Sequence, residues 1–373
     1  MHNFDVVIIG GGTAGLMLAR ELGKLKRKTL VLDRKDNLLA FSFNTLGSFI
    51  NIKDFNLTKD VISKEIDTLI FKSKNVKRAI KTDNLYVLDK KKVHEELINA
   101  MNTDDVTLKT NIHIKDILKD ASGNFTGVID KDNNEYYAKI IVDASGTNAI
   151  ISKKIGLRAK KVPLATGVEY NVAYLGNPNT MYLLSGKEYQ GGYGWIFPLK
   201  NKRAIIGFGS YNNEVIKDLK RRLNDVLEFP FIKKLVKKDN ENVEGGSIPI
   251  TPVLEKFVVN NLVCVGDSVS QVNPIVGEGY KFIFEAALMA SKAIDKSLEK
   301  EDINCLVAYE TEWKNRFSAN YKRSKSAQEK LYKYTNNNFV MDTALLLMRL
   351  RSDERIVRSL SGEYGLENKH VSS

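Results

Sequence analysis

The alternation of apolar and polar positions predicts a parallel β-α-β unit at the start of the chain. Residues 4–9 form a continuous apolar run that ends at a glycine, which is typical of a strand covered on both faces. Residues 14–25 place leucines at helical spacing, and a second apolar run follows at residues 29–32. A strand, a helix and a second strand in this order need a right-handed crossover and a parallel sheet.

The rest of the chain alternates between strand-like and helix-like patterns. Between residues 164 and 210, strand-like runs are separated by turn signals, which predicts an antiparallel sheet. An apolar run at residues 262–265 returns to the pattern of a buried strand. Helices are also expected at residues 61–71, 91–101, 217–235, 282–294 and beyond 304, and short strands at residues 106–109, 125–129 and 139–142.

Composition narrows the class of protein. A chain of 373 residues with 43% hydrophobic residues can bury a large core. Its apolar stretches are shorter than the roughly 18 residues that span a membrane, and the N-terminus lacks signal-peptide features, so a cytoplasmic location is expected. Two cysteines and four histidines show no metal-ligand spacing, so we expect no metal and place the histidines at the surface or at sheet edges.

The net charge of +12 indicates an anionic partner. No nucleic-acid-binding signature accompanies the dispersed basic residues, so a membrane surface or a phosphorylated substrate fits better than nucleic acid. Near the C-terminus, basic residues precede a short apolar stretch at residues 341–351, a combination that suits an interfacial helix on the inner face of a membrane. These basic residues are Lys314, Arg316, Lys322, Arg323, Lys325, Lys330 and Lys333. A solvated surface without a partner is the alternative.

A dinucleotide-binding fingerprint, G-x-G-x-x-G, follows the first strand and opens the first helix. Gly10 allows the tight turn, Gly12 lets the backbone approach a pyrophosphate, and Gly15 permits close packing of helix and strand. Asp33, at the end of the second strand, is placed to bind ribose hydroxyls and disfavours a 2′-phosphate despite the adjacent Arg34. The contacts expected from this region are Gly10, Gly12, Thr13, Ala14, Gly15, Asp33 and Arg34. Both FAD and NAD fit these residues.

A second loop, GDSVSQVNPIVGEGY at residues 266–280, favours FAD. FAD is long enough to need contacts at its far end, whereas an NAD domain has no need of a second glycine-bearing loop and helix. Asp267 follows a buried strand and can accept hydrogen bonds from ribityl hydroxyls. The helix that follows points its positive end at the flavin ring and stabilises the anionic reduced form. The contacts expected here are Gly266, Asp267, Pro274, Gly277, Glu278 and Gly279.

The fold class that follows is α/β, or α+β overall, in three parts. The return of a buried strand at residues 262–265 makes the first part discontinuous. We expect a Rossmann-like FAD-binding domain with a parallel sheet at residues 1–155 and 250–303. An antiparallel-sheet substrate domain is expected at residues 156–249, and a helical C-terminal segment at residues 304–373.

The fingerprint, the V-D-A-S-G turn at residues 142–146 and the loop at residues 266–280 together resemble the geranylgeranyl reductase family of FAD-dependent oxidoreductases. This family has the glutathione-reductase-type, p-hydroxybenzoate-hydroxylase-like fold, and the resemblance extends from about residue 1 to about residue 320. It implies that Ala144 and Gly146 lie beside the flavin.

The strand at residues 191–198 resembles the family motif P-x-x-Y-x-W-x-F-P, whose aromatic residues line a prenyl pocket. Gln190 replaces the first proline of the motif. The resemblance implies a substrate pocket formed by Tyr193, Trp195, Phe197 and Pro198. An ordinary core strand is the alternative.

Two departures from the family bear on the active site. Residues 86–97 resemble Y-V-x-x-R-x-x-F-D-x-x-L, but Lys90 replaces the arginine and His94 the aspartate, and lysine cannot form a planar bidentate contact. Lys90 is still expected to contact the cofactor. Residues 40–44 contain no cysteine, although archaeal members carry one in this region, so a catalytic thiol cannot be carried over.

The resemblance implies an oxidoreductase that uses reduced FAD to saturate double bonds of polyprenyl chains, with an isoprenoid lipid as substrate. Because no second fingerprint marks a nicotinamide domain, the electron donor is either ferredoxin or transiently bound NAD(P)H. A flavin-dependent monooxygenase or halogenase is an alternative, although Tyr193 and Phe197 replace residues of the halogenase W-x-W-x-I-P signature. A flavoprotein that carries electrons or binds prenyl groups without turnover is another.

Overall fold

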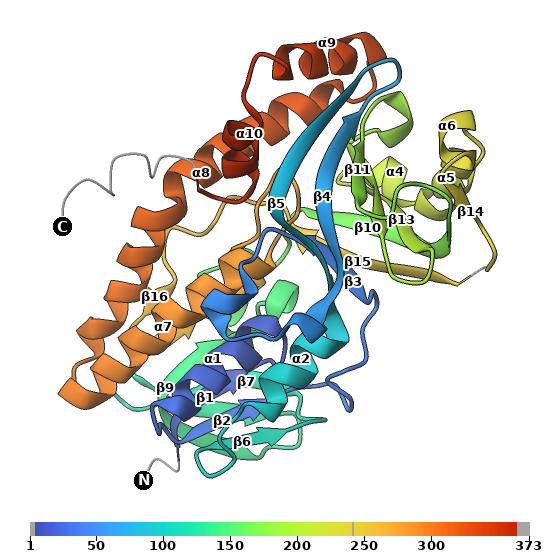
Figure 1. Ribbon diagram of the computed structural model, residues 1–373. Helices are drawn as coiled ribbons and strands as arrows, with labels where there is room; N and C mark the ends of the chain where they lie inside the picture. Colours follow the sequence, from blue (N-terminus) through green and yellow to red (C-terminus); the bar gives the residue numbers. More distant parts are fainter. Residues whose placement is uncertain (1–3, 241, 364–373) are drawn as a thin grey trace, which may run out of the picture.

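The computed structural model describes residues 4–240 and 242–363, which form two β-sheets with helices packed around them (Figure 1). The first sheet has the strand order β16-β17-β9-β1-β2-β6, and β8 and β7 continue from β9. Its strands are β1 (Phe4–Ile9), β2 (Thr29–Leu32), β6 (Val106–Lys109), β7 (Ile114–Lys119), β8 (Phe125–Asp130), β9 (Glu135–Asp143), β16 (Val258–Val259) and β17 (Leu262–Cys264). The pairs that β1 forms with β2 and β9 are parallel, as are β2 with β6 and β17 with β9.

The predicted β-α-β unit is confirmed at the centre of this sheet. Its helix, α1 (Thr13–Lys24), packs against α7 (Tyr280–Lys300), and both helices lie over the sheet in Figure 1. Val6, Val7 and Ile8 of β1 have no exposed surface, as the continuous apolar run requires of a strand covered on both faces. Parallel pairing brings the carboxyl ends of β1, β2, β9 and β17 to one edge, where the predicted cofactor loops begin.

The second sheet has the order β14-β10-β13-β12-β11-β4-β5-β3, with β15 also paired to β10. Its strands are β3 (Thr45–Ser48), β4 (Ile62–Lys72), β5 (Lys77–Asp89), β10 (Leu164–Tyr174), β11 (Thr180–Leu184), β12 (Gly192–Pro198), β13 (Arg203–Ser210), β14 (Val236–Lys237) and β15 (Val243–Pro249). All its pairs are antiparallel except β4 with β11. Short helices α4 (Asn213–Ile216), α5 (Leu219–Leu227) and α6 (Pro230–Lys233) follow β13.

The prediction of a helix at residues 61–71 is wrong, because this segment forms β4. Register shifts interrupt its pairing with β5 between residues 62 and 64 and between residues 66 and 68. These irregularities place Ile62, Ile66 and Leu69 in the core at spacings of four and three, which resemble a helical repeat. The predicted domain limits stay a prediction, but the second sheet uses residues 45–89 as well as residues 164–249.

The helical C-terminal segment extends along both sheets. It consists of α8 (Val307–Tyr334), α9 (Asn338–Met348) and α10 (Asp353–Leu360), and Figure 1 shows α9 next to the turn between β4 and β5. Trp313, Phe317 and Tyr321 of α8 are buried against α7. In the described parts of the chain, no helix is both long and apolar enough to cross a membrane. Two further helices, α2 (Lys90–Asn99) and α3 (Ile150–Lys154), follow β5 and β9.

Candidate active site

Two cavities meet where the carboxyl edge of the first sheet faces the second sheet. The smaller one encloses about 240 Å³ and the larger one about 290 Å³. Thr13, Asp267 and Ile283 line both of them. The two cavities therefore form one elongated site that joins the first sheet to the second.

The smaller cavity lies at the N-terminus of α1. Gly10 has a φ of +108°, and a Cβ there would lie 2.4 Å from the carbonyl oxygen of Ala144. A Cβ at Gly15 would lie 1.9 Å from the carbonyl oxygen of Gly10, so this buried glycine shapes the turn without lining the cavity. Gly12 caps α1 without a side-chain hydrogen bond, and a Cβ there would meet nothing within 4 Å. The free N–H groups of α1 form an anion-binding site at this end.

Apart from Gly15, the residues predicted for this end of the cofactor line the smaller cavity: Gly10, Gly12, Thr13, Ala14, Asp33, Arg34, Ala144 and Gly146. The carboxylate of Asp33 is fixed by the backbone, because Gly11 N donates to Oδ2 at 2.6 Å and Lys35 N donates to Oδ1 at 2.7 Å. Each oxygen keeps lone-pair capacity for a ligand hydroxyl. The predicted residue Gly266 is buried and lines neither cavity.

Asp267 lies at the junction of the two cavities. Burial raises the pKa of its carboxyl to about 6, against the opposing charges of Arg158 and Lys90. The buried Arg158 holds this loop, since its Nη1 donates to the carbonyl oxygens of Asp267 and Ser268, each at 2.6 Å. The sequence carried no signal for Arg158, because a single arginine outside any motif does not reveal its partners.

The loop before α7 is held by the rest of the protein through three successive carbonyl groups, at residues 274–276. Gln328 Nε2 donates to the first at 2.6 Å, and Tyr332 Oη donates to the second at 2.8 Å. Tyr193 Oη donates to the third. Gln328 and Tyr332 belong to α8 and Tyr193 to β12, so two distant elements fix the position of this loop.

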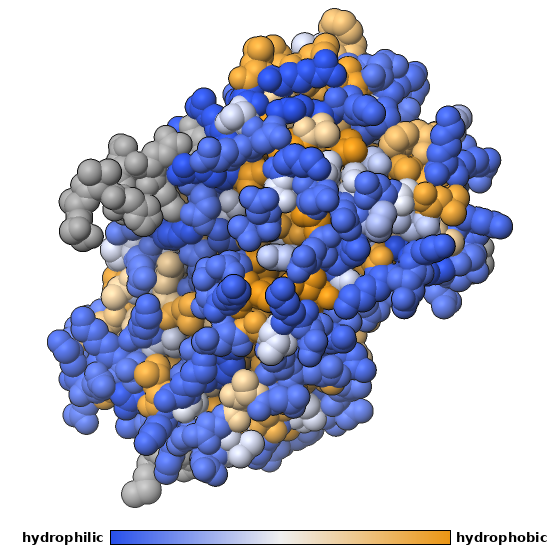
Figure 2. All heavy atoms as spheres, in the orientation of Figure 1, coloured by the Kyte–Doolittle hydropathy of each residue, from blue (hydrophilic) through white to orange (hydrophobic). Residues whose placement is uncertain are grey.

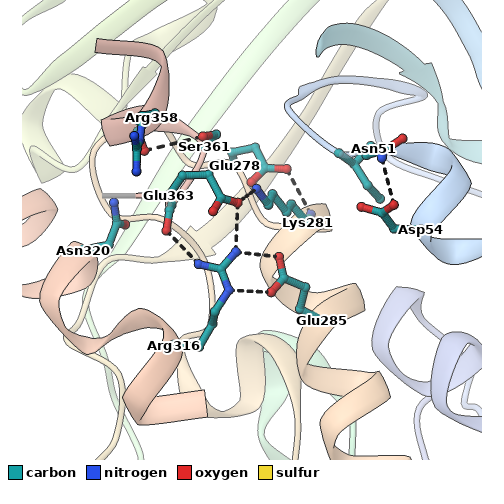
Figure 3. A network of polar contacts seen from close by, with 12 residues as sticks. Asn51, Asp54, Glu278, Lys281, Glu285, Arg316, Asn320, Arg358, Ser361 and Glu363 are labelled. Atoms are coloured by element: carbon teal, nitrogen blue, oxygen red, sulfur yellow. Dashed lines mark hydrogen bonds and ion pairs between the residues drawn. The ribbon is translucent and has the colours of Figure 1, made fainter. Parts of the chain in front are cut away.

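Behind the loop, a polar network joins α7, α8 and the C-terminal turn (Figure 3). Glu363 accepts from Lys281 and from Arg316, whose Nη2 lies 2.8 Å from Glu363 Oε1, and Arg316 also binds Glu285. Glu278 is buried, and its Oε1 accepts from Ser48 Oγ at 2.6 Å. Burial raises the pKa of the Glu278 carboxyl. The network anchors the helix whose N-terminus faces the larger cavity.

That N-terminus is partly capped. Lys281 N in the first turn of α7 donates to Glu278 Oε1 at 3.1 Å, whereas the N-cap residue Gly279 offers no side chain. Gly277 has a φ of +66° that favours glycine. Gly277, Gly279, Glu278 and Pro274 all line the larger cavity. The dipole of α7 therefore points at the space next to Asp267.

Strand β12 presents its aromatic side chains to the larger cavity. Tyr193, Trp195 and Phe197 line it, and the rings of Trp195 and Phe197 stack at 6.1 Å. Pro198 is buried and lies outside the lining, because successive residues of a strand face opposite sides.

The Trp195 indole lies flat against glycines of the neighbouring strands. A Cβ on Gly207 would lie 2.2 Å from the ring, and one on Gly167 would lie 2.9 Å from it. Because these positions carry no side chain, the indole reaches across β13, and its Nε1 donates to Glu169 Oε2 of β10 at 3.0 Å. Sequence reasoning missed Glu169; the glycines at alternate positions of β13 were the available signal.

Lys90 lies at the start of α2 and lines the larger cavity. Its Nζ is 3.9 Å from the ring centroid of Phe43 and 4.8 Å from that of Phe41. Burial and the nearby Lys35 lower the pKa of Lys90 to about 8. The segment that lacks the family cysteine thus supplies aromatic partners for this lysine.

The expectation that the histidines lie at the surface or at sheet edges is wrong for His94. Its side chain is 2% exposed, and its Nε2 lies 3.0 Å from Thr13 Oγ1 in the fingerprint loop. Burial, together with Lys90 and Lys35, lowers the pKa of His94 to about 3, so the ring is neutral. His94 faces inward because α2 packs its buried side against α1. His2 and His370 lie outside the described residues.

Solved structures with this architecture include flavin-dependent enzymes. A geranylgeranyl bacteriochlorophyll reductase-like protein from Thermoplasma acidophilum has a TM-score of 0.85 at 21% identity, with 98% of this chain and 97% of that chain covered. A flavin-dependent brominase has a TM-score of 0.75 at 18% identity, with 97% and 94% covered. The fold is therefore one that flavin-dependent oxidoreductases adopt.

The family described as Lycopene cyclase protein matches residues 5–355, and the chain belongs to this family. A digeranylgeranylglycerophospholipid reductase from Methanococcus aeolicus is 28% identical over 333 residues, which cover 84% of this chain and 83% of the relative. The resemblance to geranylgeranyl reductases is thus confirmed, and the protein is an oxidoreductase with a flavin cofactor.

Proposed function

We propose that the protein is an FAD-dependent reductase that saturates carbon–carbon double bonds of geranylgeranyl-type chains in lipids. The observation that carries this proposal is the continuity of the two cavities at Asp267. A dinucleotide lying from α1 towards α7 would have its reactive end near the aromatic side chains of β12. The relative from Methanococcus aeolicus, by its name, acts on such a lipid.

The residues around the elongated site fit FAD. The open N-terminus of α1 suits the pyrophosphate, and Asp33 suits the hydroxyls of the adenosine ribose. Asp267 suits the ribityl chain, and the positive end of the α7 dipole suits the edge of the flavin ring. When bound and reduced, FAD supplies a hydride. The remaining predicted contacts are Arg34 at the adenine end and Lys90 at the flavin end.

The substrate side offers apolar surface to a bound chain. Tyr193, Trp195 and Phe197 offer flat surfaces against which an unsaturated chain can pack, and their π faces can stabilise developing positive charge. Isolated double bonds resist hydride transfer, so a dry and apolar surrounding is required.

Incubating the reduced protein anaerobically with a geranylgeranyl glycerophospholipid, followed by mass spectrometry, tests the proposal. We expect pairs of hydrogen to be added and the flavin to be reoxidised in step with them; the oxidised protein serves as the control. An unchanged lipid with flavin that stays reduced would contradict it. A product that forms only with oxygen would indicate the monooxygenase or halogenase reaction, which the shared fold permits.

We also propose that either ferredoxin or NAD(P)H donates the electrons. The described residues include a single glycine fingerprint, which the FAD pyrophosphate would occupy. Following flavin bleaching with NADPH and, separately, with reduced ferredoxin distinguishes the two donors. A transiently bound nicotinamide would give a rate that saturates with NADPH concentration.

We propose that α9 docks on an anionic membrane surface, from which a lipid substrate would be drawn. Phe339 of α9 is 79% exposed and Leu350, two residues after the end of the helix, is 84% exposed, and Figure 2 shows an apolar area at this end of the molecule. Arg349 and Arg351 flank Leu350 and complement anionic headgroups, and Arg349 Nη2 also donates to the carbonyl oxygen of Lys77 at 3.3 Å. In the expected basic cluster, Arg316 and Lys325 make internal contacts with Glu285 and with the carbonyl oxygen of Ile250.

Cosedimentation with anionic vesicles tests the docking. We expect binding at low salt, release at high salt, and loss of binding in Phe339→Ser/Leu350→Ser. Vesicles of neutral lipid are the control. No binding to anionic vesicles at low salt would contradict this part of the proposal.

A further inference from the structure

A buried carboxyl group lies in the wall of the larger cavity. Glu169 of β10 is 6% exposed and lines the cavity together with Trp195 and Lys90. In the sheet it stands opposite Glu244 of β15 on one side and Gly207 of β13 on the other. Residues directly opposite one another share a face, so Glu169 and Glu244 lie on the same side of the sheet.

The two oxygens of Glu169 have different surroundings. Oε2 accepts a hydrogen bond from Trp195 Nε1 at 3.0 Å, whereas Oε1 is buried without a hydrogen-bond partner. A buried charged oxygen without a donor is strongly destabilised. A neutral carboxyl group with its proton on Oε1 removes this conflict, because Oε2 then accepts as a carbonyl and Oε1 becomes a hydroxyl group with a proton to donate.

The groups around Glu169 shift the pKa of its carboxyl in both directions. Burial raises the pKa of Glu169 to about 8; the hydrogen bond from Trp195 opposes the rise, Glu244 adds to it, and Lys90 opposes it. Glu244 is itself held as an acceptor, with Asn44 N at 2.9 Å and Asn44 Nδ2 at 2.8 Å. The carboxyl group of Glu169 therefore carries its proton at neutral pH.

We propose that Glu169 donates the proton that completes the reduction, an assignment that rests on the proposed function. With reduced flavin bound, the π bond of the alkene would break as one carbon takes a hydride, and with it both electrons, from the cofactor. The neighbouring carbon would take the proton of Glu169 Oε1, and the Glu169 carboxylate would regain a proton from solvent.

Two neighbours complete this assignment. Trp195 is a positioning residue, since its indole fixes Oε2 and leaves Oε1 as the oxygen that carries the proton. Lys90 lies close enough to interact with Glu169 electrostatically, so its positive charge stabilises the carboxylate that remains after proton transfer.

The central variant is Glu169→Gln, which keeps an acceptor oxygen for Trp195 but has no acidic proton. We expect the rate of prenyl reduction to fall by roughly 100-fold or more, the usual scale for removing a general acid. Flavin content and the rate of flavin reduction by the donor should stay unchanged. Glu244→Gln is the matched control, because Glu244 lies in the same row of the sheet but lines neither cavity. At pH 6 it should turn over at the wild-type rate.

Infrared difference spectra against pH give a readout that does not depend on turnover. The holoprotein should show the C=O band of a protonated carboxyl that disappears as the pH rises through about 8, and Glu169→Gln should lack it. Glu244→Gln should move this transition to lower pH, because it removes a like charge. Trp195→Phe should move it to higher pH, because it removes a hydrogen bond that stabilises the charged form.

The outcomes separate this inference from the proposed function. If the wild-type protein shows the band but leaves every prenyl lipid unchanged, the proposed function is wrong and the inference falls with it. If the wild-type protein reduces the lipid and Glu169→Gln does so equally fast, only the inference is overturned. At neutral pH, the wild-type protein should show a protonated-carboxyl band that Glu169→Gln lacks. The absence of such a difference between the two spectra would also overturn the inference.

Discussion

The two ends of the elongated site differ in how the chain forms them. The smaller cavity is formed largely by backbone: glycines, the open N-terminus of α1 and a carboxylate fixed by two backbone N–H groups. The larger cavity also has lining glycines and a helix N-terminus, that of α7, but it adds side chains from several elements of the second sheet and α8, with a buried acid and a lysine over aromatic rings. A local motif can specify the first kind of site, whereas the second depends on strand pairing between distant segments.

The largest expected effect is on the backbone-formed end. Gly15→Ala would place a Cβ 1.9 Å from the carbonyl oxygen of Gly10, which the turn cannot move away. We expect flavin affinity to fall by more than about 4 kcal/mol, roughly 1,000-fold, and the apoprotein to be destabilised. Gly12→Ala is the contrasting variant, because a Cβ there meets nothing within 4 Å. It should weaken flavin binding while leaving thermal unfolding of the apoprotein unchanged. Equal unfolding temperatures for both variants would contradict the distinction.

A smaller effect is expected at the junction. Asp267→Ala should weaken FAD binding by about 1.5–3 kcal/mol if the carboxylate accepts a hydrogen bond from the ribityl chain. Calorimetric titration of the apoprotein with FAD measures this. Asp267→Asn, which keeps one acceptor oxygen, should lose less. Unchanged affinity in both variants would mean that this aspartate only shapes the loop that Arg158 holds.

At the substrate end, the sharpest variant is Gly207→Ala. Its Cβ would lie 2.2 Å from the Trp195 ring and would force the indole away from Glu169. Turnover of the prenyl lipid should fall about tenfold, roughly 1.4 kcal/mol, with flavin content retained. Gly209→Ala is the milder comparison, since its nearest ring contact would be 3.2 Å.

Trp195→Ala should likewise lose turnover and keep flavin. Loss of folding in Trp195→Ala would instead support an ordinary core role for this strand.

The smallest effect is the pH dependence of apoprotein stability. Folding raises the pKa of Glu169 from its ordinary value to about 8, so the folded state binds the extra proton and stability falls as the pH rises through this window. The slope is at most about 1.4 kcal/mol per pH unit. The lowered pKa of Lys90 has the opposite effect above about 8, where stability rises again.

Unfolding temperatures from pH 5 to 10 should therefore pass through a minimum near pH 8. Glu169→Gln should flatten the descending limb, and Lys90→Met should flatten the ascending one. Curves that are identical in wild type and Glu169→Gln would show that the Glu169 carboxyl does not titrate in this range.

The first sheet and its loops could be read from sequence because each depends on neighbouring residues. The glycine fingerprint, Asp33 and the loop at residues 266–280 are local patterns, and the parallel β-α-β unit follows from them. Their roles in binding FAD stay predictions.

The substrate side could be read only in part. The aromatic alternation of β12 was visible, but the contact between Trp195 and Glu169 joins residues 26 positions apart across an intervening strand. The irregular pairing of β4 gave its buried residues a helix-like spacing, which is why residues 61–71 were predicted to be a helix. His94 was misplaced because a single histidine on a short helix shows nothing of the elements that cover it.

The loop at residues 274–276 has a consequence for how this architecture can be recombined. Its three carbonyl groups are held by donors from β12 and α8 and by none from the sheet that supplies the fingerprint. A chimera that transplants the first sheet with α1 and α7 into another protein would carry the loop without the residues that hold it. The cofactor site is therefore not a portable module. Its exchange between relatives requires that β12 and α8 travel with it.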